Sequence, residues 1–423
     1  MTGRAFAPYR LVARRTRDVP SSAREGPVLR PTRSPSRSLV RGHAATLALA
    51  LALAAPMATL ACRAAPGAEP TATATAPPRI DFAAQVAALS EPGGYFDSDN
   101  LISNERSYLH VIGALRRLGV RGGAYIGVGP DQNFSYIAHV RPSIAFMFDV
   151  RRDNLIEHLL FKALFAASRN RLEYLALLTG RPVPADVDAW RERSLESIVA
   201  YLDSTQATPA SEAAAREIAR RGAERTRVPL SESDVATFAR FHGEFIANGL
   251  ELRYTSRGRP SRAFYPTLRD LMLERDLEGE RSSYLARDED FQFVKALQAR
   301  DLVIPVTGNL GGEQALAAVG RLVASRGERV SVLYTSNAED YLMRDGAFAR
   351  FAQTVAKLPR DPKSVIIRSY FGGFRGAHPF AVPGYPSTQL LQTIDAFAAA
   401  QIEGAMPTYS ELVTRDAIDP RPH

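Results

Sequence analysis

Cysteine is almost absent from this sequence: Cys62 is the only one in 423 residues. No disulfide can therefore form within one chain. The seven histidines show neither H-x-x-x-H nor H-E-x-x-H spacing, so the sequence predicts no metal site of the zinc type. A G-x-S-x-G nucleophile elbow is missing as well. These absences argue against the common cysteine, serine and zinc hydrolase classes.

Net charge is also missing from most of the chain, although the total is +8. Residues 1–41 contain ten arginines and only two acidic residues, Asp18 and Glu25, so this segment alone carries a charge of +8. Residues 42–423 are neutral overall, which gives no argument for a nucleic-acid partner. The apolar fraction of 45% is that of a globular protein with enough chain for a large core.

The N-terminal sequence is typical of an exported protein. An uncharged apolar stretch, residues 43–61, follows the arginines and ends in TLAC, which resembles a bacterial lipobox with Cys62 as the lipidated residue. The Pro/Ala/Thr-rich residues 63–79 are typical of a tether because they cannot form a core. We expect a lipoprotein signal with a long basic n-region over 1–62, a tether over 63–79, and a folded domain over 80–423 anchored to a membrane through the lipid.

Alternatives stay open for this N-terminal region. The apolar stretch is also compatible with a transmembrane helix, with a chance apolar run in a disordered tail, or with a signal cut without lipidation. Export would place the domain at the periplasmic or outer-membrane face, whereas a misread signal would leave it in the cytoplasm. Residues 1–36 are long for an n-region, so the start codon is open too.

From residue 80 onward, helical and strand patterns alternate. Apolar stretches predict five strands that are buried on both faces, at 122–129, 143–150, 302–308, 329–337 and 364–371. With helices between them, they predict an α/β fold with a doubly wound, mostly parallel sheet, to which the C-terminus can add an edge strand.

Helical patterns fill the remaining segments. An amphipathic helix before the first strand carries Leu109, Ile112, Leu115 and Leu118. A long helical insertion, about residues 155–285, follows the second strand. One of its helices begins with the capping-box-like pair Ser231 and Asp234.

The turn after the first strand has the spacing of a cofactor loop. Gly127 and Gly129 allow a ligand to approach the backbone, and Asp149, at the end of the next strand, is placed to accept hydrogen bonds from ribose hydroxyls. The third glycine of the dinucleotide fingerprint is missing, and Asp131 puts a negative charge where a pyrophosphate would lie. This pattern argues against NAD or FAD and favours S-adenosylmethionine, which has no phosphate. A tight turn with an incidental strand-end aspartate is the alternative.

The Gly127 loop and the acidic strand end resemble class I S-adenosylmethionine-dependent methyltransferases. The segments LISNERSYLHV, GGAYIGVGPDQNFSYIAHVRPSIAFMFDVRRDNLIEHLLFKALF and VLYTSNAEDYL are more closely similar to an uncharacterised bacterial family with a methyltransferase-like fold, some of whose members carry lipoprotein signals. The similarity covers most of residues 95–375. It implies a Rossmann-like, methyltransferase-type sheet in which Gly127, Gly129 and Asp149 hold the cofactor.

The same resemblance implies that Ser336, Asn337 and Glu339 face the substrate. One departure concerns the turn after the third strand. Asn309 and Leu310 stand where that family has an acidic residue and a phenylalanine. If that acid binds cofactor or substrate, this member is weakened or inactive.

Other polar segments supply the remaining candidate residues. Asn337, Glu339 and Tyr341 are candidate catalytic residues that would orient an acceptor beside the methyl group, with helix capping as the alternative interpretation. Four candidate cofactor contacts complete the site: Asn104, Glu105, Asp131 and Asn133. Capping by Ser103 is the alternative for the segment 103–108. The Gly/Pro/aromatic loop 371–388 is a candidate lid.

Two functional hypotheses follow. The first is an S-adenosylmethionine-binding, methyltransferase-like protein with an unknown acceptor. The second is an exported, membrane-anchored lipoprotein whose methyltransferase-like fold is non-catalytic and serves as a binding or scaffold module. The two conflict because S-adenosylmethionine is made and kept in the cytoplasm. The sequence indicates no oligomeric state.

Overall fold

The computed structural model describes residues 81–422 except 258–261 and 403–407. The predicted signal, its lipidation residue Cys62 and the tether lie outside these residues. Within the described part of the chain, no helix is long and apolar enough to cross a membrane.

The described residues form six strands and a larger number of helices, joined by loops. The strands are β1 (Ala124–Val128), β2 (Ile144–Asp149), β3 (Val303–Thr307), β4 (Val330–Ser336), β5 (Val365–Tyr370) and β6 (Thr388–Thr393). The helices are α1 (Phe82–Leu89), α2 (Ile112–Arg117), α3 (Asn133–Val140), α4 (Arg152–Ala167), α5 (Arg171–Leu178), α6 (Leu195–Ser204), α7 (Pro209–Glu224), α8 (Glu232–Asn248), α9 (Leu268–Met272), α10 (Asp288–Ala299), α11 (Ala315–Ser325), α12 (Ala338–Arg344), α13 (Phe348–Ala356), α14 (Ile394–Ile402) and α15 (Tyr409–Thr414). Short 3-10 helices lie at Arg106–Val111, Val187–Trp190, Gly249–Glu251 and Gly373–Arg375.

The strands form one sheet in the order β3-β2-β1-β4-β5-β6. β1 to β5 run parallel, and β6 runs antiparallel to β5. Every residue of β3 and β5 is buried, so apolar side chains do not alternate with exposed polar ones, although β5 also buries Arg368 and Ser369. The expected α/β fold with a mostly parallel sheet is confirmed, and the C-terminal sequence adds the edge strand.

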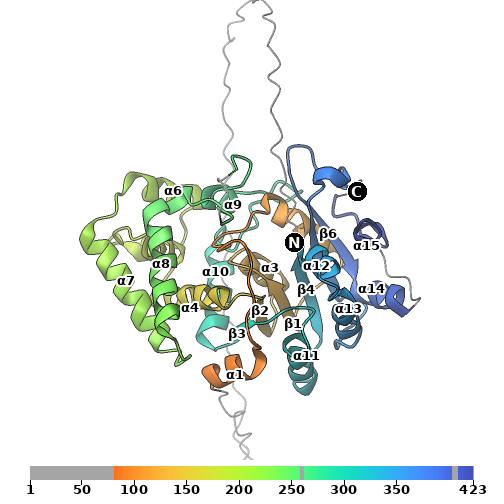
Figure 1. The fold of residues 1–423 in the computed structure, drawn as a ribbon. Helices are drawn as coiled ribbons and strands as arrows, with labels where there is room; N and C mark the ends of the chain where they lie inside the picture. Colours follow the sequence, from red (N-terminus) through yellow and green to blue (C-terminus); the bar gives the residue numbers. More distant parts are fainter. Residues whose placement is uncertain (1–80, 258–261, 403–407, 423) are drawn as a thin grey trace, which may run out of the picture. The chain divides into compact units, whose positions relative to one another are not determined.

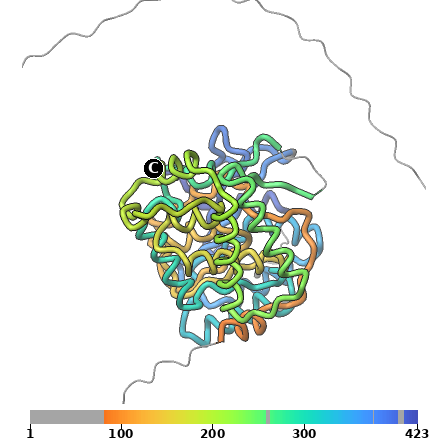
Figure 2. The backbone as a smooth tube through the Cα atoms, turned by 90° about the vertical axis from the view of Figure 1, so that its left-hand side faces the viewer, coloured from red at the N-terminus to blue at the C-terminus, as the bar shows by residue number. Residues whose placement is uncertain are grey.

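Helices cover both faces of this sheet (Figure 1). α3, α4 and α10 lie on one face, and α11, α13 and α14 lie on the other. α4 contacts β2 and β3 directly, so it packs on the sheet. α7 and α8 pack against α4 from outside and belong to the long helical stretch expected between the second and third strands. Figure 2 looks onto this outer layer, in green.

Capping side chains set where helices of that outer layer begin. Ser231 Oγ accepts a hydrogen bond from Asp234 N at 3.2 Å, and the Asp234 carboxylate accepts one from Ser231 N at 2.9 Å. The capping box expected from the sequence is therefore confirmed at the start of α8. Thr208 and Thr267 cap α7 and α9 in the same reciprocal way.

The prediction of one amphipathic α-helix before β1 is wrong, because two short helices of different type lie there. The first, Arg106–Val111, is a 3-10 helix, and α2 covers only Ile112–Arg117. The reason is burial on every side, because all residues from 107 to 111 are buried. The hydroxyls of Ser107 and Ser387 hydrogen-bond at 2.7 Å, which ties this turn to the start of β6.

Both edge strands of the sheet are met by other parts of the chain. Next to β3, Glu91 N donates to Thr307 O at 2.9 Å, and Thr307 N donates to Ser90 Oγ at 3.1 Å. Next to β6, Ile418 N donates to Leu391 O at 2.7 Å. Segments near the two ends of the described chain thus reach the two margins of the sheet.

Candidate functional site

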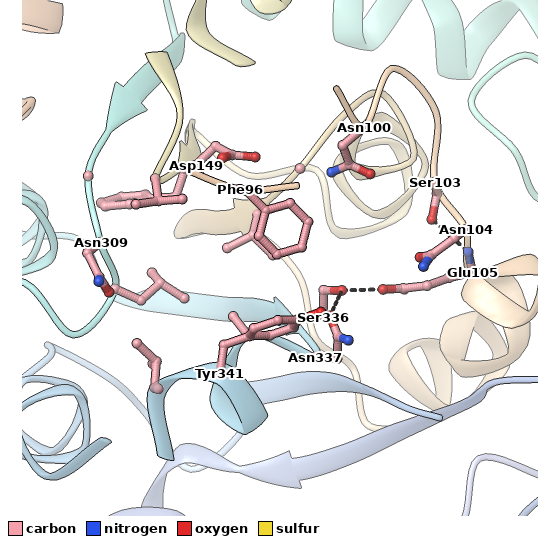
Figure 3. A pocket seen from close by; sticks show the side chains of 18 of the residues that line it. Phe96, Asn100, Ser103, Asn104, Glu105, Asp149, Asn309, Ser336, Asn337 and Tyr341 are labelled. Atoms are coloured by element: carbon pink, nitrogen blue, oxygen red, sulfur yellow. Dashed lines mark hydrogen bonds between the residues drawn. The ribbon is translucent and has the colours of Figure 1, made fainter. Parts of the chain in front are cut away.

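A cavity of about 320 Å³ lies at the carboxyl edge of the sheet. The strand order reverses between β1 and β4, and crevices of this kind are where open α/β sheets bind ligands. Residues after β1, β2, β3 and β4 line it, and the segment 95–105 covers it from the other side. Figure 3 shows side chains from these segments converging on one hollow.

The two glycines of the first loop have different roles. Gly129 lines the cavity and has a φ of +88°, a conformation that favours glycine. Its carbonyl is held by His158 Nε2 at 2.9 Å. Gly127 is buried and does not line the cavity. A Cβ there would lie 2.0 Å from Asn133 Oδ1, so this glycine makes room for a protein side chain and not for a ligand.

Asn133 and Asp131 are also buried behind the loop and do not line the cavity. Asn133 Oδ1 accepts from the Tyr125 hydroxyl at 2.7 Å, and its Nδ2 donates to the carbonyls of Val128 and Pro130. It therefore holds the turn closed. Burial raises the pKa of Asp131 to about 6, against the opposing effect of the hydrogen bond from Tyr284. The structure does not bring these two predicted cofactor contacts to the site.

Asp149 lines the cavity at the end of β2, as the sequence predicts. Its carboxylate is already engaged by Arg151, whose N and Nε donate to Oδ1 at 2.8 and 3.0 Å and whose Nη2 donates to Oδ2 at 2.7 Å. A carboxylate accepts about four hydrogen bonds, so acceptor capacity remains on Oδ2. No pattern in the sequence singled out Arg151.

Glu105 is the most firmly held polar group of the cavity wall and is only 1% exposed. Its Oε2 accepts from the Tyr334 hydroxyl at 2.6 Å and from Gln389 Nε2 at 2.8 Å. The hydroxyls of Ser336 and Ser369 also donate to this carboxylate (Figure 3 draws the bond to Ser336). Donors from β4, β5 and β6 thus fix it in place.

Two residues that precede Glu105, Ser103 and Asn104, also belong to this part of the cavity wall. Ser103 Oγ accepts from the backbone N of Glu105 at 3.0 Å, so it holds this residue rather than capping a helix. Asn104 lines the cavity beside it.

The β4–α12 turn places two of the three candidate catalytic residues at the cavity. Asn337 lines it and makes no side-chain capping bond, so capping does not use its amide. Tyr341 also lines it, with its ring 5.3 Å from that of Phe96. Ser336 precedes them with a φ of +54°, a strained conformation at a strand end.

Glu339, the third candidate, lies elsewhere. Its side chain is 1% exposed and its Oε2 is 2.5 Å from Arg368 Nε, inside the protein. The structure therefore assigns it to a buried ion pair, because the helix turn that presents Asn337 and Tyr341 to the cavity points Glu339 toward β5.

Several lining residues were not predicted, and Gln132 is the most informative. It is 6% exposed; Nε2 donates to the Tyr334 hydroxyl at 3.3 Å, while Oε1 has no hydrogen-bond partner among the described residues. Phe96 and Asn100 also line the cavity. The loop 371–388, expected as a lid, contributes no lining residue; His378 instead reaches Val413 O at 3.1 Å.

The charge of the cavity is one-sided. Its ionisable lining side chains other than tyrosines are Glu105, Asp149 and Asp345, and no lysine, arginine or histidine lines it among the described residues. In the same part of the chain, no three His, Cys, Asp or Glu side chains come together as a metal site. Arg151 offsets the charge of Asp149, but the remaining carboxylates still suit the cavity to a neutral or positively charged organic ligand rather than to a phosphate.

Comparison with known proteins places the chain in a family. A family model with the description "Domain of unknown function (DUF7790)" matches residues 101–239 and 250–409, and this range includes most of the cavity lining. No curated protein matches the chain. Because the family model covers well over half of the sequence, the chain belongs to the DUF7790 family.

Proposed function

We propose that the cavity binds S-adenosylmethionine and that the domain is a methyltransferase-type Rossmann-like domain. The observation that carries this proposal is the charge of the cavity at the point where the strand order reverses: carboxylates line it and basic side chains do not. S-adenosylmethionine is a sulfonium cation with a ribose and no phosphate. NAD and FAD bring a pyrophosphate, which this field would repel.

The size and lining of the cavity support the same ligand. Its volume of about 320 Å³ is at the lower end of small-molecule pockets, which span about 300–1,000 Å³. Phe96, Leu310 and Leu342 supply apolar contact for an adenine ring. Glu105, Asn104 and Gln132 supply polar groups at another part of the wall.

Individual residues fit the parts of the cofactor in different degrees. The unpartnered Gln132 Oε1 is an acceptor that suits an ammonium group, and the Glu105 carboxylate, which already accepts from four side chains, adds negative charge to the cavity wall. Asp149 suits a ribose hydroxyl through Oδ2, although Arg151 already occupies most of its acceptor capacity. Gly129 gives backbone access.

Bound S-adenosylmethionine would supply an electrophilic methyl group. In this chain, Asn337 and Tyr341 would orient an acceptor, a task that depends on position more than on proton transfer. Glu339 would take no part because Arg368 holds it inside the protein.

Calorimetry on the full chain tests the binding proposal. We expect S-adenosylmethionine and S-adenosylhomocysteine to bind and to raise the melting temperature, whereas NAD does neither. Glu105→Gln should weaken binding about tenfold or more, because it removes a negative charge from the cavity wall. Glu278→Gln, which changes a carboxylate in surface ion pairs with Arg116 and Arg117, is the matched control. Absence of heat and of a thermal shift with both sulfur compounds would refute the proposal.

The N-terminal sequence supports a second proposal, that the chain is an exported lipoprotein whose domain binds a ligand without transferring a methyl group. Palmitate labelling in a bacterial host tests it. We expect labelled protein whose processing is blocked by globomycin, and no label in Cys62→Ser. An unprocessed, unlabelled cytosolic protein would contradict export and would remove the conflict with a cytoplasmic methyl donor.

A further inference from the structure

We propose that residues 94–100, here called the strap, form a cover that opens to admit the ligand, and that Arg151 fastens this cover to Asp149 inside the cavity. Arg151 is then a positioning residue: it touches the strap and the cavity wall together. The coupling between them does not depend on which small molecule fills the cavity.

The strap begins at a firmly held point. Glu91 N donates to Thr307 O at 2.9 Å, and the Glu91 carboxylate accepts from backbone N–H groups at 3.0 to 3.2 Å, those of Asn309, Gln314 and Ala315. Gly94 N then donates to Val150 O at 2.7 Å. A Cβ at Gly94 would lie 2.7 Å from the Val150 side chain, so glycine is needed where the chain turns onto the cavity.

The middle of the strap has little buried surface. Tyr95 is 74% exposed and Phe96 is half-buried. The Phe96 ring meets Tyr341 edge-on, and in Figure 3 it stands in the middle of the hollow. A segment with so few buried apolar contacts opens at a low free-energy cost compared with the sheet beneath it.

Three arginines hold the far end of the strap. Arg240 and Arg257 pair with the Asp99 carboxylate at 2.5 Å each, but their side chains are 42% and 43% exposed, so water and salt weaken these pairs. Arg151 is only 4% exposed. Its Nη1 donates to the carbonyls of Ser98 and Asp99 at 2.8 and 2.5 Å, so it is the best shielded of the three arginines.

The same guanidinium reaches the cavity wall. Its Nε and Nη2 donate to the two oxygens of Asp149 at 3.0 and 2.7 Å. Because a guanidinium is planar and rigid, its contacts with the strap and with Asp149 do not adjust independently. A ligand that hydrogen-bonds to Asp149 therefore binds more tightly when Arg151 also holds the strap. This difference in affinity couples ligand binding in the cavity to closure of the strap.

Hydrogen–deuterium exchange on the full chain tests the fastening without any ligand. Arg151→Lys keeps the charge but loses the planar fork that spans both partners. We expect amide exchange in residues 95–100 to become about tenfold faster or more, with β2 unchanged. Arg106→Lys, which alters the pair between the half-exposed Arg106 and the buried Glu274 and makes no contact with the strap, is the matched control and should leave the strap as in wild type.

Exchange at wild-type rates in the strap of Arg151→Lys would overturn the proposal. Faster exchange throughout the domain would mean that the variant has lost its fold. Asp149→Asn then decides, because it keeps the size of the side chain and weakens only the cavity side of the link. It should speed exchange in the strap while leaving β2 protected, and wild-type exchange there would also overturn the proposal.

A tryptophan on the strap tests the coupling to a ligand. The chain has one tryptophan, Trp190, so Phe96→Trp in a Trp190→Phe background gives a single reporter over the cavity. S-adenosylhomocysteine is the probe. We expect its binding to change the emission, and Arg151→Lys to weaken binding about tenfold and to abolish the emission change.

Two outcomes separate this proposal from the proposed function. If S-adenosylhomocysteine does not bind, the proposed ligand is wrong, and the exchange experiment still decides the strap. If it binds Arg151→Lys as tightly as the parent and with the same emission change, the coupling through Arg151 is wrong.

Discussion

Glu339 and Arg368 form an ion pair that almost no water reaches. Their side chains are 1% and 2% exposed, and Oε2 and Nε are 2.5 Å apart. Arg368 Nη1 also donates to Gln392 Oε1 at 2.8 Å. Two charges buried together are tolerated because each compensates the other, and removing one leaves an unpaired buried charge.

We therefore expect Glu339→Gln to lower the free energy of unfolding by about 3–5 kcal/mol. Asp340→Asn changes the next residue of α12, whose partners Arg344 and Arg375 are 56% and 43% exposed, so it should cost at most about 1 kcal/mol. Urea unfolding of both variants checks this. Equal losses would show that the buried pair is no more important than the exposed ones.

Single residues also mark the limit of reading the site from the sequence. Gly127 and Gly129 belong to the same short glycine motif, and the sequence does not distinguish them. In the folded protein Asn133 fills the space beside Gly127, whereas Gly129 borders the cavity. Likewise, Glu339 and Asn337 are two positions apart and face different surroundings. A sequence motif can predict the turn. It does not predict which of its side chains forms an ion pair or hydrogen bond with another part of the protein and so cannot bind a ligand.

At the scale of elements, α4 carries an unusual buried polar face. Asn154, Glu157 and His158 are at most 2% exposed. Neither carboxylate oxygen of Glu157 has a hydrogen-bond partner among the described residues. Burial raises its pKa well above the usual value, with Arg151 opposing this shift. The folded protein therefore favours neutral Glu157, whereas the unfolded chain ionises this residue near pH 4.5.

This difference predicts how α4 affects stability with pH. Because the folded pKa is raised, the cost of Glu157 is absent below about pH 4.5 and grows as pH rises toward the folded value. Glu157→Gln should remove that cost, so the free energy of unfolding of this variant relative to wild type should increase as pH rises above about 4.5, and urea unfolding measures this difference. Glu313→Gln, at a side chain 77% exposed, should show no such trend. A difference from wild type that does not change with pH would contradict this account.

Elements differ in how well the sequence predicts them. The five parallel strands are predictable because their sequences are mostly apolar on both faces, and that pattern is local. The 3-10 helix at Arg106–Val111 is not, because β6, almost 280 residues away in sequence, buries the side that a helix would leave in water. The strap escapes prediction for the same reason: only the folded sheet places Phe96 over the cavity.

For the whole molecule, three buried histidines determine much of the response to acid. Burial lowers the pKa of His110, His158 and His242 to about 4 each. The unfolded chain protonates them near pH 6.5, so the stability they contribute is present above pH 6.5 and is lost as pH falls toward 4. Asp131 and Glu157 act in the opposite direction and reduce this slope.

We expect the free energy of unfolding to fall as pH falls from 6.5 toward 4, because the unfolded chain takes up protons on these histidines first. In Glu157→Gln this acid slope should be steeper than in wild type, because the opposing effect of Glu157 is removed. Unfolding by urea at half-unit steps from pH 4.5 to 8 measures this slope. A flat profile between pH 4.5 and 6.5 would contradict this account, because it would mean that the histidines are protonated equally in the folded and unfolded protein.

The covered margins of the sheet bear on how copies of this protein behave toward each other. Uncovered edge strands offer rows of free N–H and C=O groups that another molecule can extend. Here Glu91 occupies a hydrogen-bonding position beside β3, and Ile418 does so beside β6. Neighbouring copies thus meet an interrupted ladder on either flank, and intermolecular strand addition is discouraged even at high local concentration.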